Sequence, residues 1–409
     1  MKVDTMRAID RWVGIPLCFL LTLLQLFTSR RGEGGKPRRI LFLELSEMGS
    51  TILADPAMRK ARQVFEAELF FVIFKRNAAS LDFLRTVPEE NVYTIREDSL
   101  LTLAADTLGF LAWCRRRRID TVVDLELFSR FTALLTGMSG AANRVGFYRF
   151  HNEGLYRGEL LTHRVAYNPH IHIAKNFVAL INALACPVVE TPYSKTFIPD
   201  EEITIPRIIA GERDSERMRA TVREAFPAYD PDQHRIVLFN PNASELLPQR
   251  RWPQSHFVAL ANQVLTHWQD VVILITGAPD EDFQAEKLKS RTDHPRMVNF
   301  AGKVRLSELP TLYELASLMV TNDSGPGHFA SVTDMPTIVL FGPETPALYA
   351  PLGNTEAITA HLACSPCVSA SNHRKTACRD PLCMQAIPPE RVFDSIRAVL
   401  DDGQLLQLG

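Results

Sequence analysis

The stretch Thr321-Asn322-Asp323-Ser324-Gly325-Pro326-Gly327-His328-Phe329-Ala330, with Pro336-Thr337-Ile338-Val339-Leu340-Phe341-Gly342-Pro343 shortly after it, decides the fold. Residues 318–320 have the length of a buried strand, 327–333 predict a short helix, and 336–341 predict the next strand. Asp323 and Ser324 therefore lie where a strand ends and a helix begins. Backbone N–H groups at such a place favour an anion, and glycines let the backbone approach it. An ordinary loop with a Ser N-cap fits the same residues, so both interpretations stay open.

Outward from this stretch, apolar strand-like runs alternate with helical segments. Further strands are predicted at residues 40–43, 69–74, 92–95, 121–125, 236–239 and 271–275. This alternation predicts an α/β fold with parallel sheets covered on both faces. At 409 residues two domains are expected, and the proline-rich segment from Cys186 to Arg207 is the best linker. We predict an N-terminal helix and linker (1–37) and two Rossmann-like domains (38–200 and 201–409).

Composition excludes several classes of protein. A hydrophobic content of 46% and a charged content of 22% are typical of a globular protein. The net charge of −2 argues against a nucleic-acid binder, and seven cysteines are too few for a secreted disulfide scaffold. No G-x-G-x-x-G pattern follows the first predicted strand, which disfavours a nicotinamide dehydrogenase.

Residues 12–28 form a mostly apolar run flanked by basic residues. The run is slightly shorter than the ~20 residues that a spanning helix needs. Small and polar residues recur along it at helical spacing, namely Gly14, Cys18, Thr22, Gln25 and Ser29. This pattern favours a monotopic helix lying in an anionic leaflet, with a spanning helix, a signal peptide and a core helix as the alternatives.

Four motifs occur in the order seen in a known family. They are 40–58, Arg250-Arg251-Trp252-Pro253, 300–306, and 323–328 with 341–346. Together they resemble glycosyltransferase family 9, which includes the ADP-heptose:lipopolysaccharide heptosyltransferases. The resemblance covers roughly residues 38–400 and implies a GT-B fold, with two Rossmann-like domains facing a cleft.

The resemblance also implies an activity. An inverting, metal-independent enzyme would move a sugar, with heptose as one candidate, from an ADP-heptose-like donor to a lipid-linked glycan such as lipopolysaccharide core. The N-terminal half would bind the acceptor and the C-terminal half the donor. The expected location is the cytoplasmic face of the inner membrane, peripheral or monotopic, with a membrane surface but no nucleic acid as partner. The alternative is a non-catalytic, nucleotide-binding, membrane-associated protein.

The turn after the first predicted strand departs from the family pattern. Relatives usually end it with Gly-Asp, whose Asp is regarded as the base for the acceptor hydroxyl, whereas this chain has Gly49-Ser50. A serine cannot act as that base at its ordinary pKa. Glu47 is the nearest carboxylate on the same loop, and Asp55 lies one helical turn later. A Ser50 helix cap and a solvated Glu47 are the plain alternative.

The donor site is expected on loops of the C-terminal half. By resemblance, residues 240–244 hold the diphosphate and Arg250 stands where relatives carry Lys. A guanidinium can grip phosphate oxygens bidentately, and a plain surface charge is the weaker alternative for Arg250 and Arg251. Glu281 and Gly302 fall where family members hold the nucleoside, and an exposed acid is the alternative for Glu281. The predicted donor residues are Asn242, Ser244, Arg250, Glu281, Gly302, Asp323, Ser324, Gly325, Gly327 and His328.

Four cysteines gather late in the chain, at Cys364, Cys367, Cys378 and Cys383. Four thiolates in two close pairs are a zinc ligand set, and the first pair has a suitable spacing. The second pair is looser. A structural zinc, a disulfide and free thiols therefore remain open, and catalysis is predicted to need no cofactor.

Overall fold

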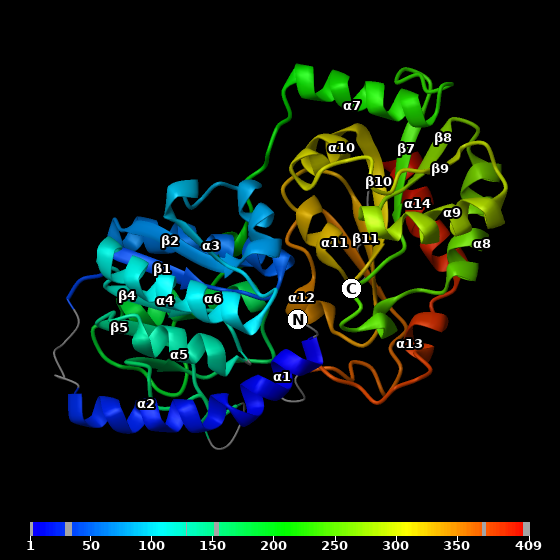
Figure 1. The fold of residues 1–409 in the computed structure, drawn as a ribbon. Coiled ribbons are helices and arrows are strands. Elements are labelled where there is room, and N and C mark those ends of the chain that lie inside the picture. The colour runs from blue at the N-terminus through cyan, green and yellow to red at the C-terminus, as the bar shows by residue number, and fades with distance from the viewer. Residues whose placement is uncertain (1–2, 29–34, 128, 151–154, 370–373, 404–409) are drawn as a thin grey trace. The chain divides into compact units, whose positions relative to one another are not determined.

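The structure, a computed structural model, describes residues 3–28, 35–127, 129–150, 155–369 and 374–403 (Figure 1). It contains two compact units, an N-terminal unit of residues 1–204 and a C-terminal unit of residues 205–409. Each unit holds one six-stranded parallel sheet. Residues 29–34, which include Ser29 and part of the predicted linker, lie outside the described residues.

The N-terminal sheet has the strand order β3-β2-β1-β4-β5-β6. Its strands are β1 (Arg39–Leu43), β2 (Glu68–Phe74), β3 (Val92–Ile95), β4 (Thr121–Asp124), β5 (Asn143–Phe147) and β6 (His163–Val165). The chain moves outward from β1 to β3 and then returns to place β4 beside β1. The carboxyl ends of β1 and β4 therefore flank the topological switch point, where open α/β sheets bind ligands.

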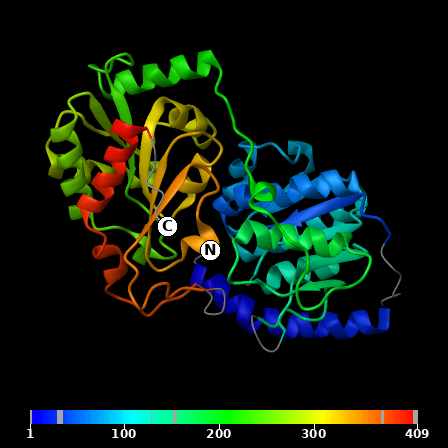
Figure 2. The same cartoon turned by 180° about the vertical axis from the view of Figure 1, so that it is seen from behind.

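Helices cover both faces of this sheet (Figures 1 and 2). On one face, α4 (Leu100–Arg117) and α5 (Arg130–Met138) bury residues against the strands, including Phe110 and Trp113. Trp113 meets Phe70 edge-on, with ring centroids 5.6 Å apart. On the other face, α3 (Met48–Phe65) and α6 (Ile173–Ala185) pack together.

Two N-terminal helices, α1 (Val3–Trp12) and α2 (Gly14–Thr28), lie beside α5 (Figure 1). The small and polar side of α2 faces the protein. Cys18 is buried, Gln25 Nε2 donates to the carbonyl of Gly137 at 3.0 Å, and Thr22 Oγ1 accepts from Glu159 N at 3.0 Å. The opposite side is exposed and apolar, with Leu20, Leu23, Leu26 and Phe27. Thr5–Phe27 is long and apolar enough to cross a membrane by length and composition.

The C-terminal sheet repeats the same path, with the order β12-β11-β10-β7-β8-β9. Its strands are β7 (Arg235–Asn240), β8 (Val271–Ile275), β9 (Met297–Asn299), β10 (Ala316–Asn322), β11 (Thr337–Phe341) and β12 (Thr355–Thr359). Its helices are α7 (Glu212–Ala225), α8 (Gln254–His267), α9 (Asp282–Thr292), α10 (Leu309–Leu315), α11 (Gly325–Ala330), α12 (Pro346–Tyr349), α13 (Leu382–Gln385) and α14 (Pro389–Asp402). The switch point lies between β7 and β10.

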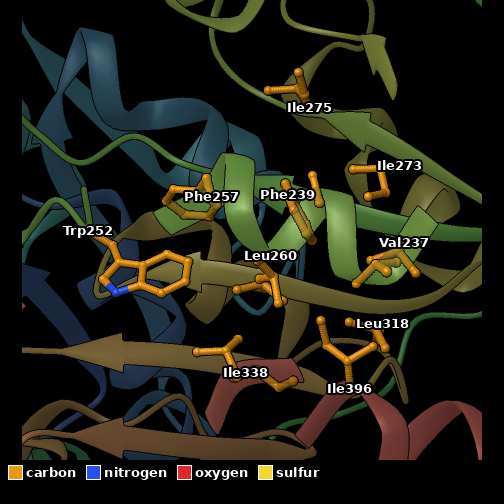
Figure 3. Packing of buried hydrophobic residues seen from close by; sticks show 14 of the residues in the cluster. Val237, Phe239, Trp252, Phe257, Leu260, Ile273, Ile275, Leu318, Ile338 and Ile396 are labelled. Carbon is orange, nitrogen blue, oxygen red and sulfur yellow. The ribbon is translucent and has the colours of Figure 1, made fainter. Parts of the chain in front are cut away.

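The core of this unit fixes a loop of the candidate site. Figure 3 shows Trp252 beside Phe257 and Leu260 of α8. The rings of Trp252 and Phe257 are 4.9 Å apart, and the indole N–H donates to the carbonyl of Ile387 at 3.0 Å. Because Trp252 is anchored in this way, the preceding residues Arg250 and Arg251 have a defined position.

Candidate functional site

The loop after β1 carries the proposed base. Glu47 is the residue before α3 and has an extended backbone, with φ −133° and ψ 124°. Its side chain does not cap the helix, and its Oε2 accepts a hydrogen bond from Ser50 Oγ at 3.4 Å. Ser50 lies inside the first turn of α3 rather than at its N-cap. The capping role considered for Ser50 is therefore wrong, and its hydroxyl is directed at Glu47 instead.

Asp55, the other carboxylate considered, lies deeper in α3 and is fully buried. Its Oδ2 accepts from Arg59 Nε at 2.7 Å, and its Oδ1 accepts from the hydroxyl of Thr86. Both oxygens are thus engaged within the core. This arrangement gives Asp55 a structural role and leaves Glu47 as the candidate on the loop.

Glu126, which follows β4, was not recognised from the sequence. Its buried Oε1 accepts three hydrogen bonds, from Leu45 N and Ser46 N at 3.1 Å each and from Ser46 Oγ at 2.7 Å. Burial raises the pKa of Glu126, hydrogen bonds from Ser46 and Leu45 oppose this, and the charges of Asp124 and Glu47 raise the pKa further. The sequence did contain a signal for Glu126. Asp124 and Glu126 are acidic residues at the end of β4, the strand that pairs with β1.

Arg157 holds the end of β4. It forms a buried ion pair with Asp124, and its Nη1 donates to the carbonyl of Glu126 at 2.7 Å. Burial raises the pKa of Asp124, and the guanidinium of Arg157 opposes that rise. The carboxyl edge of the N-terminal sheet is therefore acidic and internally braced.

In the C-terminal unit, Asn322 organises the loops at the switch point. Its Oδ1 accepts from Trp252 N at 3.0 Å, and its Nδ2 donates to the carbonyl of Pro241 at 2.8 Å. The side chain is fully buried. It ties the end of β10 to the loop after β7 and to the loop that carries Arg250, a role that the sequence did not reveal.

Arg250 and Asp323 meet at this point. Arg250 Nη1 lies 3.4 Å from Asp323 Oδ2, and the two side chains are 18% and 5% exposed. Among the residues that the structure describes, the buried Nε of Arg250 has no hydrogen-bond acceptor. The Arg250 side chain as a whole stays partly exposed, and charge-assisted bonds from a guanidinium to phosphate oxygens are among the strong ones.

The glycine loop is arranged differently from the expectation. The helix after it is Gly325–Ala330 rather than 327–333, and it has six residues. Ser324 precedes this helix without capping it, and its hydroxyl donates to the carbonyl of Asn322 at 3.1 Å. A Cβ at Gly327 would stand 3.2 Å from Pro351, so the packing favours glycine there. His328 is buried within the helix.

The remaining donor candidates gather near the ends of β7, β8 and β9. A Cβ on Gly277 would approach Glu281 Oε2 to 2.8 Å and Asn242 Nδ2 to 3.3 Å. Burial raises the pKa of Glu281, although its carboxylate accepts from Ala278 N at 2.7 Å. Gly302 has φ +70° and donates to the carbonyl of Gly277 at 2.9 Å. Ser244 is exposed and accepts from Leu246 N.

Three of the late cysteines lie on the segment between β12 and α13, and Cys383 lies in α13, which packs against β11. All four are free thiols, and within the described ranges no group of three or more His, Cys, Asp or Glu side chains could hold a metal. Ser365 Oγ donates to the carbonyl of Gly342 at 2.5 Å, and Gln249 Nε2 donates to that of Cys378 at 3.0 Å. The loop is thus attached to the segment that carries Arg250, while residues 370–373 lie outside the description.

Comparison with known proteins assigns this chain to a family. The profile of glycosyltransferase family 9 (heptosyltransferase) matches residues 115–377. The chain belongs to glycosyltransferase family 9. Among solved structures, ADP-heptose lipopolysaccharide heptosyltransferase II of E. coli has a TM-score of 0.67 at 19% identity, covering 89% of this chain and 99% of the other. A family 9 glycosyl transferase from Veillonella parvula has a TM-score of 0.66 at 16% identity, covering 91% and 99%.

Curated family 9 relatives are heptosyltransferases. The lipooligosaccharide heptosyltransferase 2 of Haemophilus influenzae is 36% identical over 125 residues, 30% of this chain and 36% of the relative. That of Campylobacter jejuni is 28% identical over 178 residues, 42% and 53% respectively. The chain thus spans between about a third and about half of these relatives. The predicted α/β fold, of GT-B type with an N-terminal apolar helix, is confirmed.

Proposed function

We propose that this protein is an inverting glycosyltransferase that transfers a heptose-like sugar from an ADP-heptose-like donor to a lipopolysaccharide core acceptor. The observation that carries the proposal is the Arg250 guanidinium, partly exposed and oriented by Asp323, at the switch point of a family 9 chain. Relatives named as heptosyltransferases support the choice of sugar. The E. coli structural relative is named for ADP-heptose, which supports the choice of nucleotide.

In this proposal the C-terminal unit binds the donor. Arg250 pairs with the diphosphate and stabilises the charge that develops on it as the sugar leaves, which is a large catalytic term for such donors. Asp323 keeps Arg250 oriented through their 3.4 Å contact. The backbone N–H groups of Ser324 and Gly325 add weaker donors, whereas Gly327 N donates to the carbonyl of Ser324 at 3.2 Å and shapes the turn. His328 stays in the packing of this loop. Asn242, Glu281 and Gly302 form the nucleoside side of the site.

The N-terminal unit supplies the base in this proposal. The acceptor hydroxyl oxygen forms the new bond to the anomeric carbon while the bond from that carbon to the diphosphate oxygen breaks. The hydroxyl proton passes to Glu47, and the nucleoside diphosphate leaves with the bonding electron pair. Ser50 contributes a hydrogen bond to Glu47 at 3.4 Å, which orients the carboxylate.

The proposed location is the cytoplasmic surface of the inner membrane, with α1 and α2 lying in the plane of the leaflet. The side of α2 that carries Cys18, Thr22 and Gln25 forms hydrogen bonds with the rest of the N-terminal unit, and the opposite apolar side is exposed. A spanning arrangement would break these contacts. Arg7 and Arg11 would face anionic headgroups, at roughly 1 kcal/mol for each charge.

One finer point concerns a structural zinc. The four late thiols are a suitable ligand set by type. Within the described residues, however, no three such side chains lie close enough together to hold a metal. Elemental analysis with thiol counting after unfolding decides between zinc, a disulfide and free thiols.

The test is a transfer assay with defined nucleotide sugars and truncated lipopolysaccharide acceptors. Donor consumption that depends on the acceptor, with a product of inverted anomeric configuration, supports the proposal. The competing function is nucleotide binding without catalysis, favoured by Ser50 in place of the usual Asp. Saturable binding of nucleotide sugars without any turnover over the full acceptor set would establish that function instead.

A further inference from the structure

We propose that Glu126 is a positioning residue, which holds the loop that carries Glu47 and keeps a carboxylate beside it. The inference rests on the proposed role of Glu47 as the base. It assigns a catalytic consequence to a side chain that does not itself reach the reacting atoms.

The contacts of Glu126 are concentrated on one short segment. A single oxygen, Oε1, receives Leu45 N, Ser46 N and Ser46 Oγ at 3.1, 3.1 and 2.7 Å. These residues directly precede Glu47, whose backbone begins α3. On the same segment, Asn77 Nδ2 donates to the carbonyl of Leu45 at 2.9 Å. The polypeptide between β1 and α3 is therefore held by side chains from outside the loop.

The backbone of Glu126 is itself held by Asp124 and Arg157. Its backbone N–H donates to Asp124 Oδ1 at 3.2 Å, and its carbonyl accepts from Arg157 Nη1 at 2.7 Å. Arg157 Nε also donates to the carbonyl of Ser129 at 2.9 Å, just before α5. A displacement of Glu126 would consequently disturb an entire buried network. This rigidity is what a group must have in order to position a loop.

Other ionisable groups also face Glu126. They are Glu47 from the β1–α3 loop, Asp124 from β4, and Arg157 from the segment before β6. Burial raises the pKa of Glu126, and the negative charges of Asp124 and Glu47 raise it further. Because like charges in a poorly solvated site repel, the ionised form of Glu126 is disfavoured beside Glu47.

The same strand pair offers a matched control at its opposite end. Asp120 precedes β4, and its Oδ2 accepts from Arg38 N and Arg39 N, each at 3.1 Å. It resembles Glu126 in bonding type, since a carboxylate receives backbone N–H groups next to β1. It differs in location, because it lies at the amino edge of the sheet, away from Glu47.

The experiment compares Glu126→Gln, Glu126→Ala and Asp120→Asn for kcat, donor KM, the pH profile of kcat and thermal unfolding. We expect Glu126→Ala to lower kcat by about 10²-fold at unchanged donor KM, the scale caused by small misplacements of reacting groups. Glu126→Gln, which keeps an acceptor oxygen for Leu45 N and Ser46 N, should retain more of kcat than Glu126→Ala does. Asp120→Asn should stay within about twofold of the wild type in kcat, because its contacts lie far from the loop.

Equal kcat in Glu126→Ala and Asp120→Asn, or a kcat of Glu126→Gln no higher than that of Glu126→Ala, would overturn the inference. Glu126→Gln keeps an acceptor oxygen and serves if Glu126→Ala does not fold. Glu47→Gln distinguishes a failure of the proposed base from a failure of the positioning role of Glu126. Normal turnover of Glu47→Gln refutes the proposed base, whereas an inactive Glu47→Gln beside normal Glu126 variants refutes this inference alone.

Discussion

The two units have the same strand order, yet the carboxyl edges of their sheets carry opposite chemistry. At the switch point of the N-terminal unit lie carboxylates, with Glu47, Asp124 and Glu126 braced by Arg157. The corresponding edge of the C-terminal unit carries amides (Asn240, Asn242 and Asn322) and the cation Arg250, whose charge is partly balanced by Asp323. Topology thus fixes where a site can form, and side chains decide what it can do.

This difference matches two steps of one reaction. An edge with clustered carboxylates suits the acceptance of a proton, because neighbouring negative charge raises the affinity of each carboxylate for it. An edge with neutral amides and a partly exposed guanidinium suits an anionic diphosphate. If the edges have these separate tasks, substitutions in the two units must change different kinetic parameters.

The largest expected effect is a loss of kcat on substitution of Glu47, at the carboxyl edge of the N-terminal sheet. Glu47→Gln removes the proton acceptor but keeps the size of the side chain, so kcat should fall by roughly 10²- to 10⁴-fold. Donor affinity, measured by calorimetry, should be unchanged. Ser50→Asp on the wild-type background is the companion variant. Normal turnover of Glu47→Gln together with a gain in Ser50→Asp would remove Glu47 from the mechanism.

The next effect comes from the cationic edge. Arg250→Ala should lower kcat by about 10²-fold or more, since one stabilising donor at the leaving group is lost. Arg250→Lys should recover part of it, because the charge is kept without the bidentate geometry. Arg251→Ala is the matched control, as Arg251 is engaged with the carbonyl of Ala243 at 2.7 Å. Equal losses in Arg250→Ala and Arg251→Ala would contradict the assignment.

A smaller effect is expected for membrane attachment. Leu20→Glu with Leu26→Glu places charges on the exposed side of α2, where Leu26 is 67% exposed. Binding to vesicles of phosphatidylglycerol and phosphatidylethanolamine should fall by about 10-fold or more, since apolar area drives interfacial binding. Phe283→Glu, at a 79% exposed position on α9, is the control and should bind as the wild type does. Equal binding of all three proteins would place the membrane contact elsewhere.

Much of the fold was predictable, because long apolar runs specify buried parallel strands. β1, β2, β7, β8 and β11 are such runs and were predicted. The short strands β6 and β9 were missed, since three residues carry too little pattern and their pairing is set by neighbouring strands. The residues of a three-residue strand do not indicate which strand will pair with it, here β5 for β6 and β8 for β9.

The candidate site divides in the same way. Asp323 was found from its position at a strand end, and Glu47 from the family resemblance, which places the base on the loop after the first strand. Glu126 and Asn322 were missed as organisers because their partners are remote, with Ser46 separated from Glu126 by 80 positions and Trp252 from Asn322 by 70. The direction of α2 was also not evident. The predicted polar stripe exists, but it faces α5 rather than solvent.

The smallest expected effect concerns stability against pH and compares two carboxylates of the N-terminal unit. The pKa of Glu126 is raised, chiefly by burial, so its folded form holds a proton more tightly than the unfolded chain. Its contribution to stability is therefore complete below the unfolded pKa and is lost as pH rises through the folded pKa. The pKa of Asp106 is lowered to about 2 by its hydrogen bonds and ion pair with Arg96. Its contribution is present above the unfolded pKa and is lost as pH falls toward 2.

The two substitutions should therefore show opposite trends in thermal unfolding. As pH rises above the ordinary range of a glutamate, the Tm of Glu126→Gln should improve relative to the wild type, because the neutral amide avoids the cost of burying a charge. Asp106→Asn should lower Tm by only ~2 °C at neutral pH, since a pair this exposed is well screened, and that deficit should shrink in acid. Parallel trends in the two variants would mean that Glu126 is not held as a buried acid. The contrast between an acidic and a neutral edge would then lose its physical basis.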